Sequence, residues 1–483
     1  MLFPRLAADS DSRVALDFGT ERLTYAELAD VLAGLVPALT SAKRVAVWAT
    51  PTMETVAGVV AALYAGAAVV PLNPKTGERE LAHILQDSQP DVVLARADDR
   101  LPAGLQLARL DVSLDSVGAR LTAERPIDES PAFIVYTSGT TGSPKGVVHA
   151  MRAVVSNLDA LAAAWEWTEH DTVLHALPLF HVHGLIVATL GPLRRGGTVR
   201  HLGRFDEAAV AAELADGVML FGVPTMYHRL ASAVVGSREL AEAVGKARLL
   251  VSGSAALPMG VHQRIEEATG QRVVERYGLT ETLMNTAVRA DGTREAGTVG
   301  PAVAGVDVRL VDEAGVVLDG WGPAVVGEIE VRGPNLFLGY LNRPDATAAA
   351  FRDGWFRTGD LGTWTADGQL RIVGRRATDL IKSGGYKIGA GEIENVLAEH
   401  PGVVEVAVTG EPDEDLGERI VAWVVAGDPT PEPGALMDLV ARQLAPHKRP
   451  RVVRFVEALP RNEMGKVLKR ELTASADRRP LGQ

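Results

Sequence analysis

The chain contains no cysteine among its 483 residues. This absence excludes disulfide bonds, thiolate metal sites and a cysteine nucleophile, so any thiol that reacts must come from a ligand. A protein without disulfides suits the cytosol. The first residues, MLFPRLAADS, lack the basic and apolar segments of a signal peptide. We therefore expect a cytoplasmic protein.

Long hydrophobic runs and an excess of positive charge are also lacking. One uncharged stretch, residues 55–73, reaches the length of a membrane span. However, Gly58, Gly66 and Pro71 interrupt it, and its second half is typical of a buried strand. The formal net charge of −12 disfavours nonspecific affinity for nucleic acid or anionic lipid. We expect neither a nucleic-acid nor a membrane partner, and anionic ligands must meet local positive sites.

Lysine is scarce, with nine lysines against 40 arginines. Because arginine is the usual cation of this chain, a lysine more often indicates a specific role. Five of the nine lysines fall inside motifs that carry chemistry: Lys145, Lys382, Lys387, Lys466 and Lys469.

The pattern of apolar runs predicts an α/β protein of more than one domain. Up to about residue 290, strand-like runs alternate with amphipathic helical stretches, which predicts βαβ units and largely parallel sheets. Short strands separated by glycines follow and predict a small antiparallel barrel. The expected organisation is an N-terminal domain (residues 1–374, with two βαβ-type subdomains in 1–296 and the barrel in 297–374), a hinge near 375–379, and a small mobile α+β domain (375–483).

Residues 136–146, read YTSGTTGSPKG, form the most informative segment. Glycines allow consecutive backbone N–H groups to face one anion, hydroxyls add donors, and a lysine adds a point charge. The predicted phosphate-binding residues are Thr137, Ser138, Gly139, Thr140, Thr141, Gly142 and Lys145. The spacing does not fit a Walker loop, which has four residues between its glycines and a hydroxyl after its lysine. A flexible surface loop is the plainer alternative, but such loops seldom carry so many anion donors behind a buried strand.

Four further motifs fit the same chemistry. They are Glu275 to Thr282 (ERYGLTET), Thr358 to Asp360 (TGD), Gly374-Arg375, and Pro460 to Lys466 (PRNEMGK). With these motifs in this order, nearly the whole chain resembles the superfamily of adenylate-forming enzymes, which comprises acyl- and aryl-CoA synthetases, adenylation domains and luciferases.

The resemblance implies a two-step reaction with ATP, Mg²⁺ and coenzyme A. A carboxylate attacks the α-phosphate of MgATP to give an acyl-adenylate and pyrophosphate, and a thiol then displaces AMP. Negative charge accumulates where the carboxylate meets the phosphate of ATP. Cationic and N–H groups directed at the phosphorus would stabilise this charge. By motif, the loop binds the β- and γ-phosphates, Thr280 the α-phosphate and Glu281 the Mg²⁺. Tyr277 and Gly278 line the nucleotide site, Asp360 and Arg375 bind the ribose, and Lys466 bridges the acyl carboxylate and the α-phosphate.

Each of these residues also has a purely structural interpretation. Asp360 could cap a turn, Glu281 could cap a helix, and Arg375 could form a surface ion pair. Because these residues occur together and in the order of the family's motifs, the functional interpretation is favoured.

The second half-reaction implies a different arrangement of the C-terminal domain. In the family this domain rotates about a hinge just after the arginine that corresponds to Arg375, and it replaces the lysine with a loop that lines the pantetheine tunnel. The matching CoA-binding residues here are Ser383, Gly384, Gly385, Tyr386 and Lys387. The chain departs from the common pattern at the hinge, where residues 376–379 (RATD) are one residue longer than usual.

Arg276 indicates which acid is activated. Many relatives place a small residue at this position beside the acyl group, where an unpaired buried charge would be costly. A guanidinium becomes favourable if the substrate carries a second carboxylate. On this basis the chain resembles the malonyl-CoA synthetases, including those that accept methylmalonate. His183 and Ser254 are predicted to donate to the same carboxylate, and Thr189 and Met284 to bound the space beside the α-carbon.

Plainer alternatives exist for this pocket. Arg276 could form an outward-facing salt bridge. His175, His181 and His183 could be a packed cluster, although His181 matches the position that gates the pantetheine tunnel in relatives. A metal bound by two of these histidines is disfavoured because no further ligand lies at suitable spacing.

Two other functions share the nucleotide motifs. One is a stand-alone adenylation domain that loads a carrier protein, and the other is a ligase for a monocarboxylate such as acetate, propionate or an aryl acid. The expected partners are therefore small molecules. A lysine acetyltransferase and deacetylase acting on Lys466 would add regulation, because acetylation removes its charge.

Overall fold

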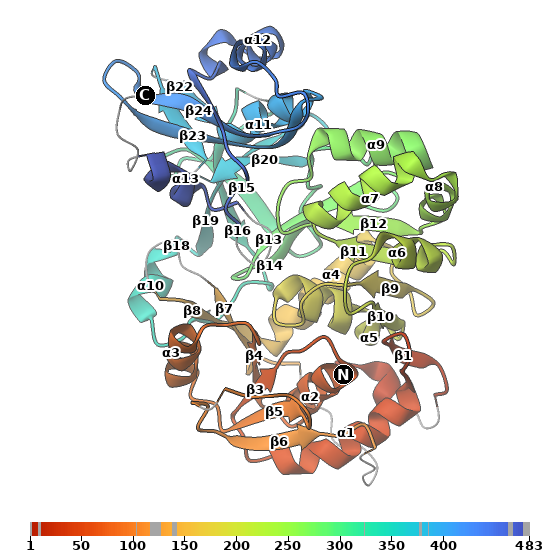
Figure 1. Ribbon diagram of the computed structural model, residues 1–483. Helices are drawn as coiled ribbons and strands as arrows, with labels where there is room; N and C mark the ends of the chain where they lie inside the picture. The colour runs from red at the N-terminus through yellow and green to blue at the C-terminus, as the bar shows by residue number, and fades with distance from the viewer. Residues whose placement is uncertain are drawn as a thin grey trace.

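The computed structural model describes residues 2–7, 11–102, 104–115, 127–137, 143–322, 324–375, 379–384, 386–461 and 467–476. The described strands form four sheets. Figure 1 shows the N-terminal elements at the bottom and the C-terminal elements at the top. Between them, elements from distant parts of the sequence lie together.

The first sheet has the strand order β17-β8-β7-β4-β3-β5-β6. Its central strands pair in parallel and are buried, as the Val-rich runs predict. The strands are β3 (Arg44–Trp48), β4 (Ala68–Leu72), β5 (Val92–Arg96), β6 (Ala108–Val112), β7 (Pro131–Thr137), β8 (Lys145–Ala150) and β17 (Gly339–Tyr340). The helices of this part are α1 (Tyr25–Leu39), α2 (Met53–Tyr64) and α3 (Glu78–Ser88).

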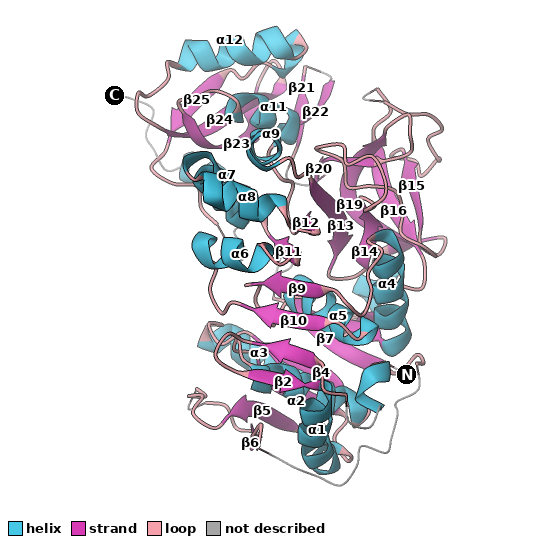
Figure 2. Ribbon diagram, turned by 90° about the vertical axis from the view of Figure 1, so that its right-hand side faces the viewer, coloured by secondary structure: helices cyan, strands magenta, loops and turns pink. Residues whose placement is uncertain are grey.

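The second sheet has the order β14-β13-β12-β11-β9-β10-β1-β2. The N-terminal β1 (Val14–Asp17) and β2 (Arg22–Thr24) belong to this sheet rather than to the neighbouring first sheet. The other strands are β9 (Thr172–His175), β10 (Thr198–His201), β11 (Met219–Gly222), β12 (Leu249–Ser252), β13 (Val273–Leu279) and β14 (Leu283–Ala287). The helices are α4 (Met151–Ala164), the π-helix η2 (Val182–Leu190), α5 (Gly191–Arg195), α6 (Glu207–Leu214), α7 (Pro224–Gly236), α8 (Arg238–Gly245) and α9 (Met259–Thr269). Figure 2 shows the stacked sheets with their flanking helices.

The third sheet is the predicted antiparallel barrel. It consists of β15 (Asp307–Val311), β16 (Gly327–Arg332), β18 (Phe351–Arg352), β19 (Trp355–Trp364) and β20 (Leu370–Arg375). The short helix α10 (Pro344–Ala349) precedes β18.

The C-terminal sheet comprises β21 (Leu380–Ser383), β22 (Tyr386–Gly389), β23 (Val403–Asp413), β24 (Gly417–Ala426) and β25 (Val452–Phe455). Helices α11 (Ala390–Ala398), α12 (Pro433–Gln443) and α13 (Lys469–Ala476) accompany it. A separate apolar cluster around Ile388, Ile393 and Ile420 forms its core. The predicted fold class, a large α/β domain with a barrel and a small α+β domain, is therefore confirmed.

The uncharged stretch of residues 55–73 divides between α2 and the buried strand β4. No helix in the described ranges is long and apolar enough to cross a lipid bilayer.

Candidate active site

The predicted phosphate loop is the turn of an antiparallel hairpin. Thr137 at the end of β7 pairs with Lys145 at the start of β8. Helix α3 fixes both ends of the turn, because the Tyr136 hydroxyl donates to Asp87 Oδ2 at 2.8 Å and His83 Nε2 donates to the Pro144 carbonyl at 2.9 Å. The turn residues Ser138, Gly139, Thr140, Thr141 and Gly142 lie outside the described residues.

A second hairpin, β13–β14, presents Thr280 and Glu281 at its tip. Strand β13 continues as far as Leu279 because β14 pairs with it. Gly278 is required there, since a Cβ would lie 1.8 Å from the Leu283 carbonyl oxygen. This hairpin tip places the predicted α-phosphate and Mg²⁺ residues opposite the first hairpin.

His149 on β8 supports this tip and was not predicted from the sequence. Its Nε2 donates to the Thr280 carbonyl at 2.6 Å. Burial lowers the pKa of His149 to about 4, so its ring is neutral at physiological pH. A histidine within an apolar strand gives no sequence signal for such a long-range contact.

Tyr340, also missed by the sequence, joins the two hairpins. Its hydroxyl donates to Glu281 Oε1 at 2.8 Å, and Lys145 Nζ lies 4.7 Å from the centroid of its ring. The predicted phosphate lysine and the predicted metal carboxylate therefore contact the same side chain.

The predicted ribose residues also meet. Asp360 on β19 and Arg375 on β20 are cross-strand partners, with Arg375 Nε 3.3 Å from Asp360 Oδ1. The Tyr277 hydroxyl donates to Asp360 Oδ2 at 2.7 Å. Asp360 thus links the barrel to strand β13, which also carries Arg276 and leads to the hairpin tip.

Arg276 points inward and is only 6% exposed. Its Nε and Nη2 atoms have no hydrogen-bond partner within the described part of the chain. Gly253 makes room for the guanidinium, because a Cβ there would lie 2.2 Å from Arg276 Cζ. Burial lowers the pKa of Arg276 to about 10, which still leaves it charged at neutral pH. The alternative of an outward-facing salt bridge is therefore wrong.

His183 is a second buried polar group close to Arg276. Neither ring nitrogen has a hydrogen-bond partner among the described residues. Burial, and then the nearby charge of Arg276, lowers the pKa of His183 well below its usual range, so the ring is neutral. It lies on η2, a rare π-helix, and such turns are frequent at functional sites.

The other residues predicted for this region differ in how far they are buried. The Thr189 hydroxyl is buried and donates to the Gly184 carbonyl at 2.7 Å, while Met284 is buried on β14. Ser254 lies on the exposed loop after β12 with a φ of 74°. The His181 ring contacts Phe180, and burial lowers the pKa of His181 to about 4.

His175 belongs to a packed cluster. Its Nδ1 accepts from the Leu177 N–H at 3.3 Å, and its ring meets His201 edge-to-face at 4.5 Å. No cluster of three or more metal-ligating side chains occurs among the residues that the structure describes.

The predicted CoA segment forms the β21–β22 hairpin in the C-terminal sheet. Ser383 is buried, Gly384 has a φ of 56°, and the Tyr386 ring stacks on His447 at 4.0 Å. Gly385, the side chain of Lys387 and the whole of Lys466 lie outside the described residues.

The hinge region contains a chain of polar contacts. Asp379 Oδ2 accepts from the Arg375 N–H at 3.0 Å, and Lys469 Nζ lies 2.9 Å from Asp379 Oδ1 and 2.7 Å from Glu394 Oε1. The two carboxylates raise the pKa of Lys469 although burial opposes them.

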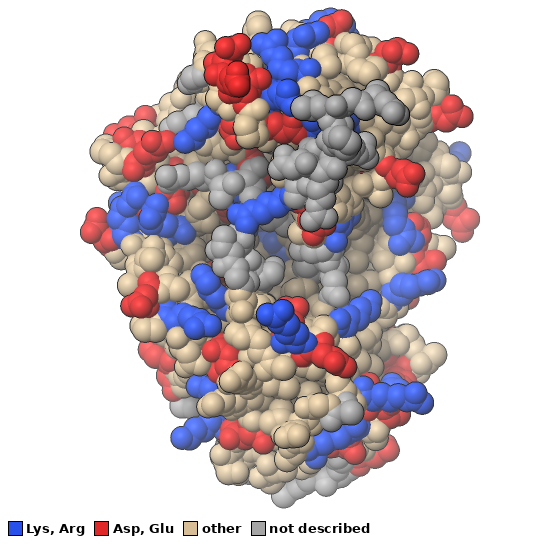
Figure 3. All heavy atoms as spheres, turned by 60° about the vertical axis from the view of Figure 1, so that its left-hand side comes forward, with Lys and Arg blue, Asp and Glu red and all other residues tan. Residues whose placement is uncertain are grey.

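The site fits a Mg²⁺–nucleotide complex. Mg²⁺ is commonly held by one or two carboxylates together with substrate phosphates, and the partly exposed Glu281 carboxylate supplies a hard oxygen ligand. Figure 3 shows side chains of both signs over one face, with Lys and Arg gathered around its hollowed middle. The net negative charge is thus compatible with local anion binding.

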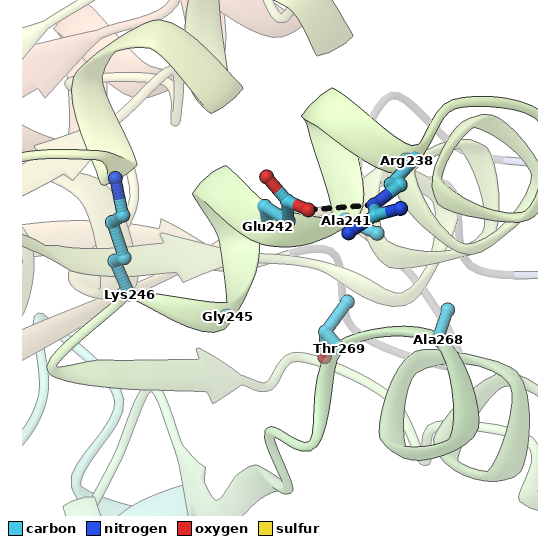
Figure 4. A pocket seen from close by; sticks show the side chains of 7 residues that line it. All are labelled: Arg238, Ala241, Glu242, Gly245, Lys246, Ala268 and Thr269. Carbon is cyan, nitrogen blue, oxygen red and sulfur yellow. Dashed lines mark hydrogen bonds and ion pairs between the residues drawn. The ribbon is translucent and has the colours of Figure 1, made fainter.

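A separate open depression of about 590 Å³ lies beside α8 and the end of α9 (Figure 4). An exposed Arg238–Glu242 pair, Lys246 and Thr269 contribute to its wall. Its lining contains none of the predicted site residues.

Comparison with known proteins places the chain in a family. The model of the AMP-binding enzyme family matches residues 3–341, and that of the AMP-binding enzyme C-terminal domain matches residues 392–466. The chain belongs to the AMP-binding enzyme family.

Within this family the chain is similar to malonate–CoA ligases and to several solved structures. A malonate–CoA ligase of Arabidopsis thaliana is 37% identical over 90% of this chain and 78% of its own length. A solved malonyl-CoA ligase with methylmalonyl-CoA and AMP bound is 60% identical over 95% of this chain and 100% of that one, with a TM-score of 0.75. ATP-bound MatB from Rhodopseudomonas palustris is 36% identical over 99% of both chains, with a TM-score of 0.90.

The buried histidines predict acid sensitivity of the fold. The pKa values of His149 and His201 are lowered to about 4 by burial, below the usual 6.5 of unfolded histidine. Below pH 6.5 the unfolded chain therefore binds more protons, and stability present above that pH is lost as the pH falls toward 4. Each such histidine should lower the free energy of unfolding by about 1 kcal/mol between pH 6.5 and 5.5.

Urea denaturation at a series of pH values measures this slope. His201→Asn should reduce it, whereas replacement of the exposed His170 by Gln should not. Equal slopes for the wild type and His201→Asn would contradict the assignment.

Proposed function

We propose that this protein joins malonate, with methylmalonate as an accepted analogue, to coenzyme A through an acyl-adenylate. The buried Arg276, without a partner for Nε and Nη2 in the described part of the chain, carries this proposal. Leaving a charge unpaired inside a protein costs several kcal/mol, so a ligand that supplies a carboxylate is expected. The malonate-activating relatives support the same substrate class.

The first half-reaction would take place between the two hairpins. One carboxylate oxygen of the diacid attacks the α-phosphorus, and the bond to the leaving pyrophosphate breaks. Lys145 and the preceding loop bind the β- and γ-phosphates, while Asp360 and Arg375 fix the ribose. Mg²⁺, when bound through Glu281, would neutralise charge on the phosphates. Arg276 and the neutral His183 hold the second carboxylate away from the phosphorus.

In the second half-reaction the CoA thiol attacks the acyl carbon, loses its proton, and AMP leaves. We propose that the domains separate at residues 374–375 and that rotation near 375–379 exchanges Lys466 for the β21–β22 hairpin. The TM-scores support two arrangements: the chain is more similar in shape to ATP-bound MatB than to the product complex, although the latter is much closer in sequence.

Two finer points complete the proposal. The lack of cysteine favours a cytoplasmic enzyme. Acetylation of Lys466 by a lysine acetyltransferase would remove its charge and stop adenylation. Intact-protein mass spectrometry before and after deacetylase treatment, paired with activity, tests the latter.

A screen of carboxylic acids tests the function. With MgATP and CoA, pyrophosphate release should be fastest with malonate, followed by methylmalonate, and should be at least about tenfold slower with acetate, propionate and aryl acids, because these leave Arg276 unpaired. Faster release with a monocarboxylate would refute dicarboxylate specificity.

The acceptor is tested separately. Replacing CoA with a phosphopantetheinyl carrier protein should abolish thioester formation, while the first turnover still releases pyrophosphate. Preferential acylation of the carrier would establish the alternative of a stand-alone adenylation domain.

A further inference from the structure

Tyr340 stands between the phosphate lysine and the metal carboxylate of the proposed adenylation site. We propose that it is a positioning residue whose hydroxyl sets the affinity of the site for Mg²⁺ and whose ring places the Lys145 ammonium. This inference rests on the adenylation half of the proposed function and is independent of which acid is used.

The position of the Tyr340 side chain is fixed from several sides. Its backbone pairs with Val147 on β8, only two residues after Lys145. Its N–H donates to Thr347 Oγ1 at 2.9 Å, and its ring meets Phe337 edge-to-face at 5.0 Å. The hydroxyl is therefore presented from a rigid strand pair rather than from a free loop.

Glu281 is held by the same segment through two contacts. The Phe337 N–H donates to the Glu281 carbonyl at 2.9 Å, and the Tyr340 hydroxyl donates to Glu281 Oε1 at 2.8 Å. A partly exposed glutamate samples several rotamers unless its carboxylate is held. With Oε1 accepting from Tyr340, the carboxylate is held and Oε2 is the oxygen left for a cation.

Lys145 depends on another part of the same side chain. Its Nζ lies 4.7 Å from the ring centroid, within the range of a cation–π contact. The hydroxyl thus acts on the metal carboxylate, whereas the ring acts on the phosphate lysine. Removing only the hydroxyl separates the two effects.

Binding of α,β-methylene-ATP, measured by calorimetry over a Mg²⁺ titration without acid or CoA, tests this inference. Tyr340→Phe should raise the Mg²⁺ concentration at half-maximal binding by about tenfold, since hydrogen-bond donors to metal ligands typically change metal affinity by 10- to 100-fold. Analogue affinity at saturating Mg²⁺ should stay unchanged, because Phe keeps the ring beside Lys145. Tyr340→Leu should also weaken binding at saturating Mg²⁺, by about two- to fivefold.

Tyr64→Phe is the matched control, since its hydroxyl contacts the Phe3 carbonyl far from the hairpins, and it should leave the Mg²⁺ midpoint unchanged. A Mg²⁺ midpoint that is unchanged or lower in Tyr340→Phe would overturn the inference. This holds also if the variant has a lower melting temperature, because a loss of stability alone would indicate a structural role. Mg²⁺-independent binding by the wild-type protein would refute the metal site of the proposed function itself, and this inference with it.

Discussion

Arg276→Met is expected to lower kcat/KM for malonate by about 10³-fold, because breaking one partner of a desolvated charge pair costs about 2–5 kcal/mol. ATP-analogue affinity should remain, since Arg276 makes none of the contacts among Lys145, Glu281 and Asp360. Propionate should not lose activity, because it has no second carboxylate. Pyrophosphate release with both acids, together with calorimetry of nucleotide binding, measures these effects.

The same variant separates a ligand-binding arginine from a structural one. Removing a buried charge without a protein partner for most of its donors should keep or raise the free energy of unfolding, by up to about 4 kcal/mol. Arg238→Met, at an exposed position on α8, is the control and should change neither activity nor stability. Unaltered malonate kinetics in Arg276→Met would remove the argument for a dicarboxylate.

The second large effect is expected for Lys466→Ala. In the proposed role of Lys466, its cation acts on the reacting carboxylate and α-phosphate, so its loss should slow adenylation by about 10²- to 10³-fold. Thioester formation from supplied malonyl-adenylate should be preserved, because the proposed rotation removes Lys466 from the site in that step. Single-turnover assays of each half-reaction measure both rates.

Lys246→Ala provides the control at an exposed lysine beside α8. Equal losses in both half-reactions of Lys466→Ala would contradict the exchange of C-terminal segments. Such a result would leave the malonate assignment intact, since that assignment depends on Arg276.

Much of the fold could be predicted because its strands are local apolar runs. The central strands β3, β4, β5 and β12 are short Val- and Leu-rich segments, the kind of run from which the βαβ units were predicted. The exceptions are pairings over long sequence distances. The two-residue strand β17 has no periodicity of its own, and the joining of β1 to β10 depends on packing more than 180 residues away.

The site shows the same division. Motif residues such as Asp360 and Arg375 could be named in advance. They become cross-strand neighbours because β19 pairs with β20. Tyr340 and His149 could not, because each acts through a contact with a distant segment. The inward direction of Arg276 was predicted from chemistry rather than pattern, by asking what a charge beside an acyl group would pair with.

Gly253 and Arg276 constrain each other. A Cβ at position 253 would lie 2.2 Å from Arg276 Cζ, so any larger residue there would force the guanidinium to move. A change at position 253 should therefore disturb the use of a diacid, although glycine itself has no side chain that could bind one.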